Sequence, residues 1–351
     1  MRLICYIGMS VAAANRGKTI MAVLVTGGAG YIGSHMVLEL ADAGEKVVVL
    51  DNLSTGFRWA VDPRAELVVG DIGDQNSVRT IVRRHAVNAI IHFAGSIVVP
   101  DSVVDPLGYY NNNTVKSRAL MEVAVSTGVK HFIFSSTAAV YGNPKENPVS
   151  EEALPAPMSP YGSSKLMTEI MLADTGRAHG LHYVALRYFN VAGADPQRRS
   201  GQSTPRATHL IKVACETALG QRTHMEVFGT DYETPDGTCL RDYIHVRDLA
   251  RAHMAALSYL RAGGQSDIFN CGYSKGYSVL QVIDAVKRAS GVDFEVRMAP
   301  RRPGDPAAIV AKSEKIRSIL GWAPQLDDLD GIVSHALAWE DKLADLKRRA
   351  S

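Results

Sequence analysis

Cysteine is scarce in this sequence, and neither sign of charge dominates it. The four cysteines among 351 residues show no Cys-x-x-Cys spacing, which favours reduced thiols in a cytoplasmic protein over a disulfide framework. The net charge is only +2 and there is no basic stripe, so neither nucleic acid nor a membrane is expected as a partner. No metal site is expected, and no internal repeat is found. A hydrophobic content of 46% is enough for one large domain or two modest ones.

The first twenty residues lack the pattern of a fold or of a membrane anchor. Arg2 precedes an apolar run over residues 3–9, which is short for a signal peptide and far too short to span a bilayer. Met21 directly precedes the first strand-like run. We therefore expect Met21 to be the natural start, with residues 1–20 as a disordered or non-native extension. A weak export signal is the alternative interpretation.

Residues 23–34 form the stretch around which the chain is organised. An apolar run of β type leads into a glycine-rich turn and then into a helical pattern, which is the context that a dinucleotide-binding fingerprint requires. Gly27 permits a tight turn, Gly30 removes a Cβ that would block a pyrophosphate, and Gly33 lets the helix approach the sheet. The pyrophosphate would then lie on free N–H groups at the positive end of the helix.

An acidic residue at the end of the next strand completes this pattern. Residues 46–50 indicate a buried strand that ends at Asp51, roughly 20 residues beyond the glycines. A carboxylate at this point accepts hydrogen bonds from an adenosine ribose and repels a 2′-phosphate. The sequence therefore predicts a site for NAD rather than NADP.

Strand and helix patterns alternate from Met21 onward, which predicts an α/β fold of Rossmann type with a doubly wound parallel sheet. Besides those above, we expect strands at residues 65–69, 89–93, 131–134 and 183–188, and helices at residues 31–43, 74–85 and 112–125. Ligands bind beyond the carboxyl ends of such strands. One crevice should therefore collect five residues: Asp51, Asp71, Ala94, Thr137 and Asn190.

The pattern becomes less regular after Gly193. We predict an NAD-binding domain over residues 21–193 and a smaller, mixed α/β substrate-binding lobe over residues 194–351, some of whose elements, such as residues 267–270, could return to the main sheet. Residues 195–206 are rich in Pro, Gly, Arg and Ser and are expected to form a mobile loop. Helical patterns follow at residues 246–260, 279–290, 312–320 and 329–346.

Tyr161 and Lys165 are the strongest candidates for chemistry. Ser159 is a good N-cap and Pro160 suits a first turn, so a helix should place residues four apart on one face. A lysine ammonium beside a phenol favours the phenolate, which would lower the pKa of Tyr161 from its usual ~10 and make it a general base or acid. Thr137, at the end of the fifth strand, could hydrogen-bond both a substrate oxygen and the phenol.

The same spacing occurs a second time, at Tyr141 and Lys145. Pro144 lies between them, removes a helical N–H group and clashes with the preceding turn, so we interpret this copy as a loop. The spacing alone is therefore weak evidence. Tyr161 gains weight because it follows a strand that ends in a cluster of hydroxyl groups at residues 135–137.

Several motifs together resemble the extended short-chain dehydrogenase/reductase family. They lie at residues 26–35, 134–142, 159–165 and 186–190. Within this family, two further motifs are similar to the substrate lobe of the UDP-glucose 4-epimerases, at residues 240–246 and 299–305. The resemblance extends from Met21 to the end of the chain. Each motif is modest alone, but the set is specific.

The resemblance implies an isomerase that interconverts UDP-glucose and UDP-galactose by inversion at the sugar C4, through a transient 4-keto sugar and tightly bound NAD. The implied catalytic residues are Tyr161, Lys165 and Thr137. The implied NAD contacts are Gly27, Gly30, Tyr31, Ile32, Gly33, Asp51, Asn52, Asp71, Ile72, Phe93, Ala94, Gly95, Asn112, Tyr161, Lys165 and Tyr188. The implied substrate contacts are Thr137, Tyr161, Asn190, His209, Leu210, Val227, Phe228, Arg241, Tyr243, Arg302, Asp305 and Ile309.

The resemblance also implies that two arginines bind the phosphates of the substrate and that the chain forms a dimer. A sugar that presents both faces must be held mainly through its nucleotide, and the guanidinium forks of Arg241 and Arg302 suit phosphate oxygens. Asn112 could place the nicotinamide or the catalytic helix. The family further implies a homodimer, through helices near residues 112–125 and 160–173.

The sequence departs from some members of the family at three positions. Ile97 stands where some members have a lysine that contacts NAD, and His209 stands near a position that is often asparagine. Ile309 falls where a tyrosine limits the pocket near the sugar 2-substituent. Because isoleucine is shorter and cannot hydrogen-bond, UDP-N-acetylhexosamines are an alternative substrate class.

Other functions on the same scaffold are less favoured. Nucleotide-sugar dehydratases and decarboxylases generally need an acidic residue after the threonine, where this chain has Ala138 and Ala139. A reductase is disfavoured because Asp51 opposes NADPH. A non-catalytic NAD sensor would not need the set formed by Thr137, Tyr161 and Lys165, and no feature favours a structural protein.

Overall fold

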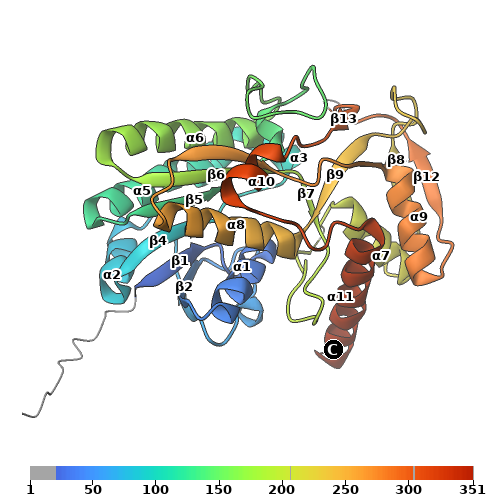
Figure 1. The fold of residues 1–351 in the computed structure, drawn as a ribbon. Coiled ribbons are helices and arrows are strands. Elements are labelled where there is room, and N and C mark those ends of the chain that lie inside the picture. Colours follow the sequence, from blue (N-terminus) through green and yellow to red (C-terminus); the bar gives the residue numbers. More distant parts are fainter. Residues whose placement is uncertain (1–20, 206, 303–304, 351) are drawn as a thin grey trace, which may run out of the picture.

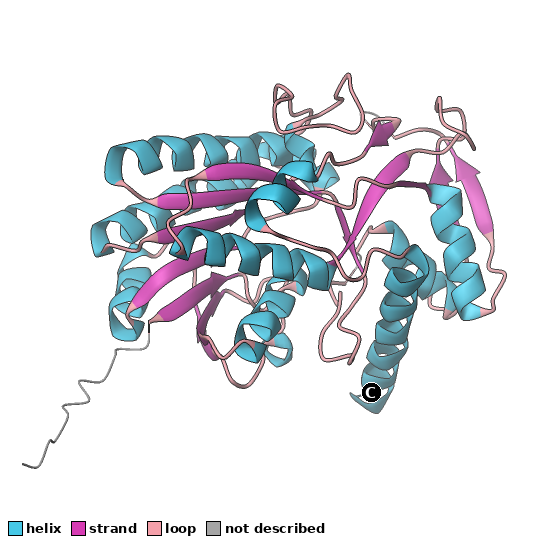
Figure 2. Cartoon of the chain, viewed as in Figure 1, coloured by secondary structure: helices cyan, strands magenta, loops and turns pink. Residues whose placement is uncertain are grey.

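The computed structural model describes residues 21–205, 207–302 and 305–350. The expected extension over residues 1–20 lies outside the described residues. A large parallel sheet has helices on both faces, and a second group of helices and short strands stands beside it, around α7, α9 and α11 (Figures 1 and 2). The predicted Rossmann-type α/β fold is confirmed.

The main sheet has seven strands in the order β10-β6-β5-β4-β1-β2-β3, and every pairing in it is parallel. Its strands are β1 (Ala22–Thr26), β2 (Lys46–Asp51), β3 (Glu66–Val69), β4 (Val87–His92), β5 (His131–Ser135), β6 (His182–Tyr188) and β10 (Asp267–Cys271). Strand order reverses between β1 and β4, which is where ligands bind in open α/β sheets. A ligand is therefore expected at the edge formed by the carboxyl ends of β1 and β4.

Alternation along β1 explains how the sheet is buried on both faces. Val23 and Val25 belong to the apolar core that α1 and α8 share with the sheet, whereas Ala22 and Leu24 belong to the core on the other face. The helices of the first face are α1 (Tyr31–Asp42) and α8 (Val246–Arg261). Those of the second face are α2 (Gln75–His85), α5 (Lys116–Thr127) and α6 (Pro160–His179).

The connection from β4 to α5 contains helical turns that were not predicted. They are α3 (Val99–Val104), α4 (Pro106–Tyr109) and η2 (Tyr110–Val115), of which η2 is a π-helical turn. The helix expected at residues 112–125 is therefore split between η2 and α5. Two short 3₁₀ turns lie after β2 and β5, at η1 (Arg58–Ala60) and η3 (Ala138–Val140).

The second part of the chain combines short strands with helices of different lengths. One small sheet contains β7 (Asn190–Ala192), β9 (Leu240–His245), β11 (Gly276–Ser278) and β13 (Ala308–Ile309), and another pairs β8 (Met225–Phe228) with β12 (Val296–Ala299). Its helices are α7 (Leu210–Ala218), α9 (Val279–Ser290), α10 (Glu314–Leu320) and α11 (Leu329–Ala350). A complete capping box at Ser278 and Gln281 starts α9. Helix α11 packs on both α7 and α9.

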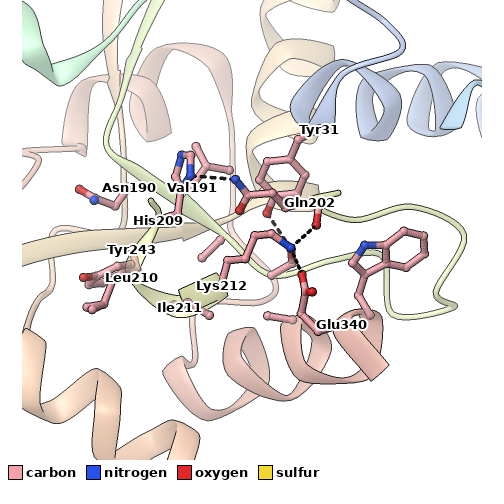
Figure 3. A pocket seen from close by; sticks show the side chains of 14 residues that line it. Tyr31, Asn190, Val191, Gln202, His209, Leu210, Ile211, Lys212, Tyr243 and Glu340 are labelled. Atoms are coloured by element: carbon pink, nitrogen blue, oxygen red, sulfur yellow. Dashed lines mark hydrogen bonds and ion pairs between the residues drawn. The ribbon is translucent and has the colours of Figure 1, made fainter. Parts of the chain in front are cut away.

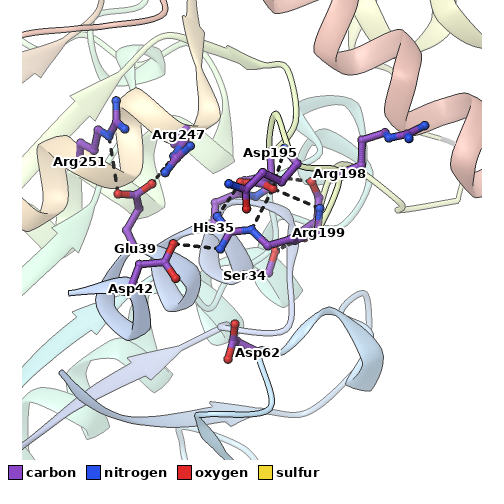
Figure 4. Close-up of polar contacts among 12 residues, drawn as sticks. Ser34, His35, Glu39, Asp42, Asp62, Asp195, Arg198, Arg199, Arg247 and Arg251 are labelled. Carbon is purple, nitrogen blue, oxygen red and sulfur yellow. Dashed lines mark hydrogen bonds and ion pairs between the residues drawn. The ribbon is translucent and has the colours of Figure 1, made fainter. Parts of the chain in front are cut away.

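The loop that begins at residue 195 is fastened to the rest of the protein. Arg199 contacts both Asp195, at 2.8 Å, and Asp42 of α1, at 2.9 Å (Figure 4). Ser200 is buried, and its hydroxyl shares a hydrogen bond of 2.7 Å with Ser34. Within the loop that was expected to be mobile over residues 195–206, these contacts fix Asp195, Arg199 and Ser200, whereas Gln197 and Arg198 are exposed.

Candidate active site

The glycine turn after β1 has the shape that a dinucleotide requires. A Cβ on Gly33 would lie 2.1 Å from the Gly27 carbonyl oxygen, so only glycine lets α1 approach the turn this closely. Gly27 itself has a φ of +72°. A Cβ on Gly30 would meet only that carbonyl oxygen, at 3.3 Å, and would otherwise occupy open space at the N-terminus of α1. No side chain caps this terminus, so its N–H groups can receive an anion.

Asp51 lies directly beside this turn. One oxygen of its buried carboxylate accepts the Ala29 backbone N–H at 2.9 Å, and the other accepts the Leu53 N–H at 2.8 Å. Each oxygen has a further lone pair, so the carboxylate can still accept hydrogen bonds from a ribose. The glycine turn, the uncapped helix and Asp51 together fit NAD.

A second group of polar side chains extends this edge of the sheet. Lys116 donates to Asp71 at 2.5 Å, and the Gly73 backbone N–H donates to it at 2.8 Å. Burial raises the pKa of Asp71, but the hydrogen bonds from Lys116, Gly73 and Asn52 outweigh burial and lower it below its usual value. Ile72, Phe93 and Ala94 follow β3 and β4 at the same edge.

Thr137 and Tyr161 meet at the carboxyl end of β5. Ser159 caps α6 by accepting the Gly162 N–H at 3.2 Å, as predicted, so Tyr161 stands in the first turn of that helix. The Thr137 side chain interacts with the Tyr161 phenol, and this interaction lowers the pKa of the phenol. Tyr161 is only 6% exposed, and Thr137 is similarly buried. A hydroxyl and a phenol are thereby held together in a site from which water is largely excluded.

The structure does not show the expected lowering of the Tyr161 pKa by Lys165. Burial raises the pKa of Tyr161, Tyr188 raises it further, and only the hydrogen bond with Thr137 lowers it. Lys165 donates instead to the Ser135 carbonyl oxygen at 3.1 Å. The loss of water around the phenol therefore outweighs any attraction to the ammonium, and Tyr161 keeps its proton at neutral pH.

Lys165 occupies a buried position beside Gly95. Burial lowers the pKa of its ammonium to about 8, and its Nζ lies 5.0 Å above the centre of the Phe134 ring. A Cβ on Gly95 would stand 3.6 Å from this nitrogen. Ser135 donates its hydroxyl hydrogen to the Tyr188 phenol at 3.0 Å, which fixes a further predicted residue at this edge.

Asn113, and not the predicted Asn112, joins the loop after β4 to α6. Its side-chain oxygen accepts the Ser96 N–H at 2.7 Å, and its amide donates to the Ser96 carbonyl and the Ser164 hydroxyl. Asn112 donates only to the Ser96 hydroxyl, at 2.9 Å. Asn113 is buried and therefore holds the catalytic helix against the cofactor edge of the sheet.

A cleft opens between the start of α1, β7, α7 and α11 (Figure 3). Five predicted residues line it: Tyr31, Asn190, His209, Leu210 and Tyr243. His209 is exposed to the cleft, but the surrounding protein and then the charge of Lys212 lower its pKa. Gln202 donates an amide hydrogen to its Nδ1 at 2.8 Å. The neutral ring therefore carries its hydrogen on Nε2, which can donate to a ligand.

A buried ion pair that the sequence did not reveal forms one wall of this cleft. Lys212 of α7 pairs with Glu340 of α11 and donates to the Gln202 carbonyl oxygen (Figure 3). Trp339, beside Glu340, donates its indole N–H to Ser203. The C-terminal helix is thus tied to the cleft, although it lies far from the other site residues in sequence.

The arginines predicted to bind phosphate lie near β8 and β9 and not in the lining of that cleft. Arg241 pairs with Asp305 at 3.1 Å and also donates to the Pro306 carbonyl oxygen at 2.9 Å. The guanidinium of Arg302 lies 3.7 Å above the centre of the Phe228 ring. One predicted arginine is therefore held in place, and the other covers an aromatic face.

Three predicted positions differ in how far they are open to ligands. Val227 is buried in the main core, so only its backbone can reach a substrate. Ile309 packs in a small apolar cluster with Tyr141 and Phe189. Ile97 is 49% exposed in the loop after β4 and offers no hydrogen-bonding group.

The geometry agrees with comparisons to known proteins. The sequence model of the NAD dependent epimerase/dehydratase family matches residues 23–272. The chain belongs to this family. This family is NAD dependent, which confirms the predicted cofactor. Relatives named UDP-glucose 4-epimerase confirm the predicted resemblance to those enzymes.

One relative and two solved structures illustrate the likeness of this epimerase family member to others. A UDP-glucose 4-epimerase of Azospirillum brasilense is 56% identical over 92% of each chain. The UDP-glucose 4-epimerase of Brucella ovis in complex with NAD is 44% identical, with a TM-score of 0.88 over 91% of this chain and 98% of that one. The UDP-Glc/GlcNAc 4-epimerase of Campylobacter jejuni is 47% identical, with a TM-score of 0.81 over 92% of this chain and 99% of that one.

No helix within residues 21–205, 207–302 and 305–350 is long and apolar enough to cross a membrane. In the same ranges, no three or more His, Cys, Asp or Glu side chains form a group that could hold a metal ion.

Proposed function

We propose that this chain interconverts UDP-glucose and UDP-galactose by inversion at the sugar C4. The observation that carries the proposal is the buried pair of Thr137 and Tyr161, which stands at the same sheet edge as the glycine turn and Asp51. Relatives named UDP-glucose 4-epimerase, similar over nine-tenths of the chain, support it.

The cofactor would be held by the elements that fit it. The N-terminus of α1 would receive the pyrophosphate over Gly30, and Asp51 would accept the ribose hydroxyls. Lys165 lies beside Gly95, where its ammonium, mostly protonated at pH 7 because its pKa is about 8, can donate to a ligand hydroxyl. NAD bound here supplies reversible hydride exchange at the sugar C4.

Tyr161 would exchange a proton with the sugar 4-hydroxyl. Thr137 can hydrogen-bond to both the phenol and the sugar oxygen, so it keeps the two in line for proton transfer. Because burial raises the pKa of Tyr161, the phenol is well suited to return a proton to the 4-keto sugar. Removing a proton from the hydroxyl requires the phenolate, so the rate should rise with pH.

The cleft beside α7 would hold the nucleotide of the substrate. The uncapped N-terminus of α7 and the Nε2–H of His209 face a space that a diphosphate could occupy. Outside the lining of this cleft, near β8 and β9, Arg241 is already oriented by Asp305, and Arg302 could move off the Phe228 ring so that the base of the nucleotide stacks there. Fixed by these groups, the nucleotide leaves the sugar free to present either face to Tyr161.

Ile309 favours UDP-N-acetylhexosamines as a second class of substrate. Ile309 provides no hydroxyl group and lies in an apolar cluster, so it would not contact an N-acetyl group through a hydrogen bond. The similar enzyme of Campylobacter jejuni is named for both UDP-glucose and UDP-N-acetylglucosamine. Comparable rates on both sugars would support a dual function, whereas no turnover of the N-acetyl sugar would exclude it.

We also propose that the chain acts in the cytoplasm as a homodimer. Apolar side chains are exposed on α3, α4, η2 and α6, which pack against one another: Val103, Val104, Leu107, Val115, Met167 and Ile170. We call this surface the α6 face. We propose that it packs against the α6 face of a second copy of the chain.

The decisive experiment is anomeric-proton NMR of the purified protein with UDP-galactose and without added NAD. Appearance of UDP-glucose is expected, and it would show both the reaction and the retention of cofactor. Tyr161→Phe should retain NAD, which is measured after denaturation, but turn over at least ~100-fold more slowly. Full activity in this variant, or no turnover by the unaltered protein supplied with NAD, would contradict the proposal and favour a binding role.

A further inference from the structure

A buried ion pair joins β6 to α6, the helix that carries Tyr161. Arg187 of β6 and Glu169 of α6 are 3% and 2% exposed. Arg187 donates three hydrogen bonds to the Glu169 carboxylate, at 2.6, 3.0 and 3.2 Å. The planar fork of the guanidinium fixes both the distance and the angle between a helix and a strand, which a lysine could not do.

The same ion pair holds the chain on both sides of Thr137. Ser136, directly before it, donates its hydroxyl hydrogen to Glu169. Tyr141, four residues after it, accepts a hydrogen bond of 3.0 Å from Arg187. The turn that carries the catalytic hydroxyl is therefore tied at one end to α6, the helix that carries Tyr161, and at the other end to β6.

The network continues into the part of the sheet contributed by the C-terminal half of the chain. Tyr141 donates to the side-chain oxygen of Asn270 on β10 at 2.7 Å, and the amide of Asn270 donates to the Val149 carbonyl at 2.8 Å. The Asn270 backbone N–H donates to Glu151 at 2.7 Å. Its members come from five separate segments, all of which meet behind Thr137.

We infer that Arg187 and Glu169 are positioning residues that keep the Thr137 hydroxyl within hydrogen-bonding reach of the Tyr161 phenol. The inference rests on the proposed function. A buried ion pair is not the most stable way to fill this space, since apolar side chains of similar volume often stabilise a protein as well or better. Its advantage is a defined geometry, and geometry is what a proton transfer requires.

The pH dependence of turnover reports this geometry. Among the groups that act on the pKa of Tyr161, Thr137 lowers it, while burial, Tyr188 of β6 and Tyr109 of α4 raise it. Lys165 follows one turn later on α6. Neither Arg187 nor Glu169 acts on this pKa directly. If Thr137 moves away, the pKa of Tyr161 rises, and the acid limb of the kcat profile must move to higher pH.

The test compares Arg187→Lys and Glu169→Gln with the unaltered holoenzyme. We expect kcat to fall about tenfold to a hundredfold, with KM for UDP-galactose nearly unchanged and the acid limb displaced upward. Two controls on α6 should keep the original pH profile. Leu172→Ala removes a buried side chain and lowers stability, and Arg177→Met breaks only an exposed ion pair with Asp174.

A double variant separates position from stability. Glu169→Met with Arg187→Met leaves no unpaired buried charge, so its melting temperature should recover relative to Glu169→Gln. Its kcat and acid limb should not recover, because Ser136 has lost Glu169 and Tyr141 has lost Arg187. Parallel recovery of stability and kcat would show a merely structural role.

The outcomes for this inference and for the proposed function are distinct. If the unaltered protein does not convert UDP-galactose, the proposed function fails. If it does, but the two single variants keep both kcat and the acid limb, the positioning role is overturned while the proposed function stands. Equal displacement of the acid limb by Leu172→Ala would also overturn it.

Discussion

Lys165 shows how burial changes a residue whose type and spacing were read correctly from the sequence. The side chain is 3% exposed, and burial lowers its pKa from 10.5 to about 8. Between these values the unfolded chain binds a proton that the folded chain does not. The free energy of unfolding therefore rises with pH between pH 8 and pH 10.5. Below pH 8 the side chain is charged in both states, so the full cost of burying the charge lowers the stability of the folded protein.

Lys165→Met should consequently be more stable than the unaltered protein at pH 7, and less so at high pH. The difference in unfolding free energy between the two should fall by about 3 kcal/mol from pH 7 to pH 10.5. Denaturant titrations at a series of pH values measure it. A pH-independent difference would mean that the ammonium is solvated in the folded protein.

Sequence patterns located individual residues where strand and helix order determined their place. Thr137 and Tyr161 were found because the end of a strand and the first turn of a helix meet in this fold. Asn113 was missed in favour of its neighbour, because a π-helical turn changes which side chain faces α6. Arg187 and Glu169 were missed because their burial depends on contacts between separate elements, which no local pattern reports.

At the scale of elements, the glycine turn and α1 yield a matched pair of variants. Gly33→Ala places a Cβ against backbone atoms and should destabilise the fold by about 1–3 kcal/mol. Gly30→Ala should cost about 1 kcal/mol or less, since its φ of −80° suits any residue. It should nevertheless weaken NAD about tenfold or more, because the methyl group occupies the anion site.

Thermal melting and calorimetric titration with NAD measure the two effects. The roles would be reversed if Gly30→Ala unfolded the protein while Gly33→Ala bound NAD normally. A loss of stability confined to Gly33→Ala would assign that glycine to packing. A loss of NAD affinity confined to Gly30→Ala would assign that glycine to the ligand.

Long elements were predictable and short ones were not. The predicted strands of the main sheet have apolar cores, and their ends were placed within two residues. Strands such as β7 and β13 contain three and two residues, too few for any periodicity. The loop over residues 195–206 was predicted to be mobile because it is rich in Pro, Gly, Arg and Ser, whereas in the fold Arg199 joins Asp195 to Asp42.

At the scale of the whole molecule, the α6 face predicts association. Val104 and Leu107 are 86% and 77% exposed, so aspartate at both positions should not harm the folded chain but should oppose burial against a second copy. Sedimentation should show a dimer for the unaltered protein and a monomer for this double variant. Val69→Asp, on β3 at the opposite edge of the sheet, is the control and should remain dimeric.

The edge strand β10 determines when the main sheet can be completed during synthesis of the chain. It pairs with β6 but is translated some eighty residues later, after β7, β8, β9 and α8. Until β10 emerges from the ribosome, β6 presents an open row of backbone groups, and Tyr141 lacks Asn270. The amino-terminal part should therefore be unable to complete its fold during synthesis, and a fragment ending at residue 193 should aggregate. The finished enzyme would be assembled in one late step.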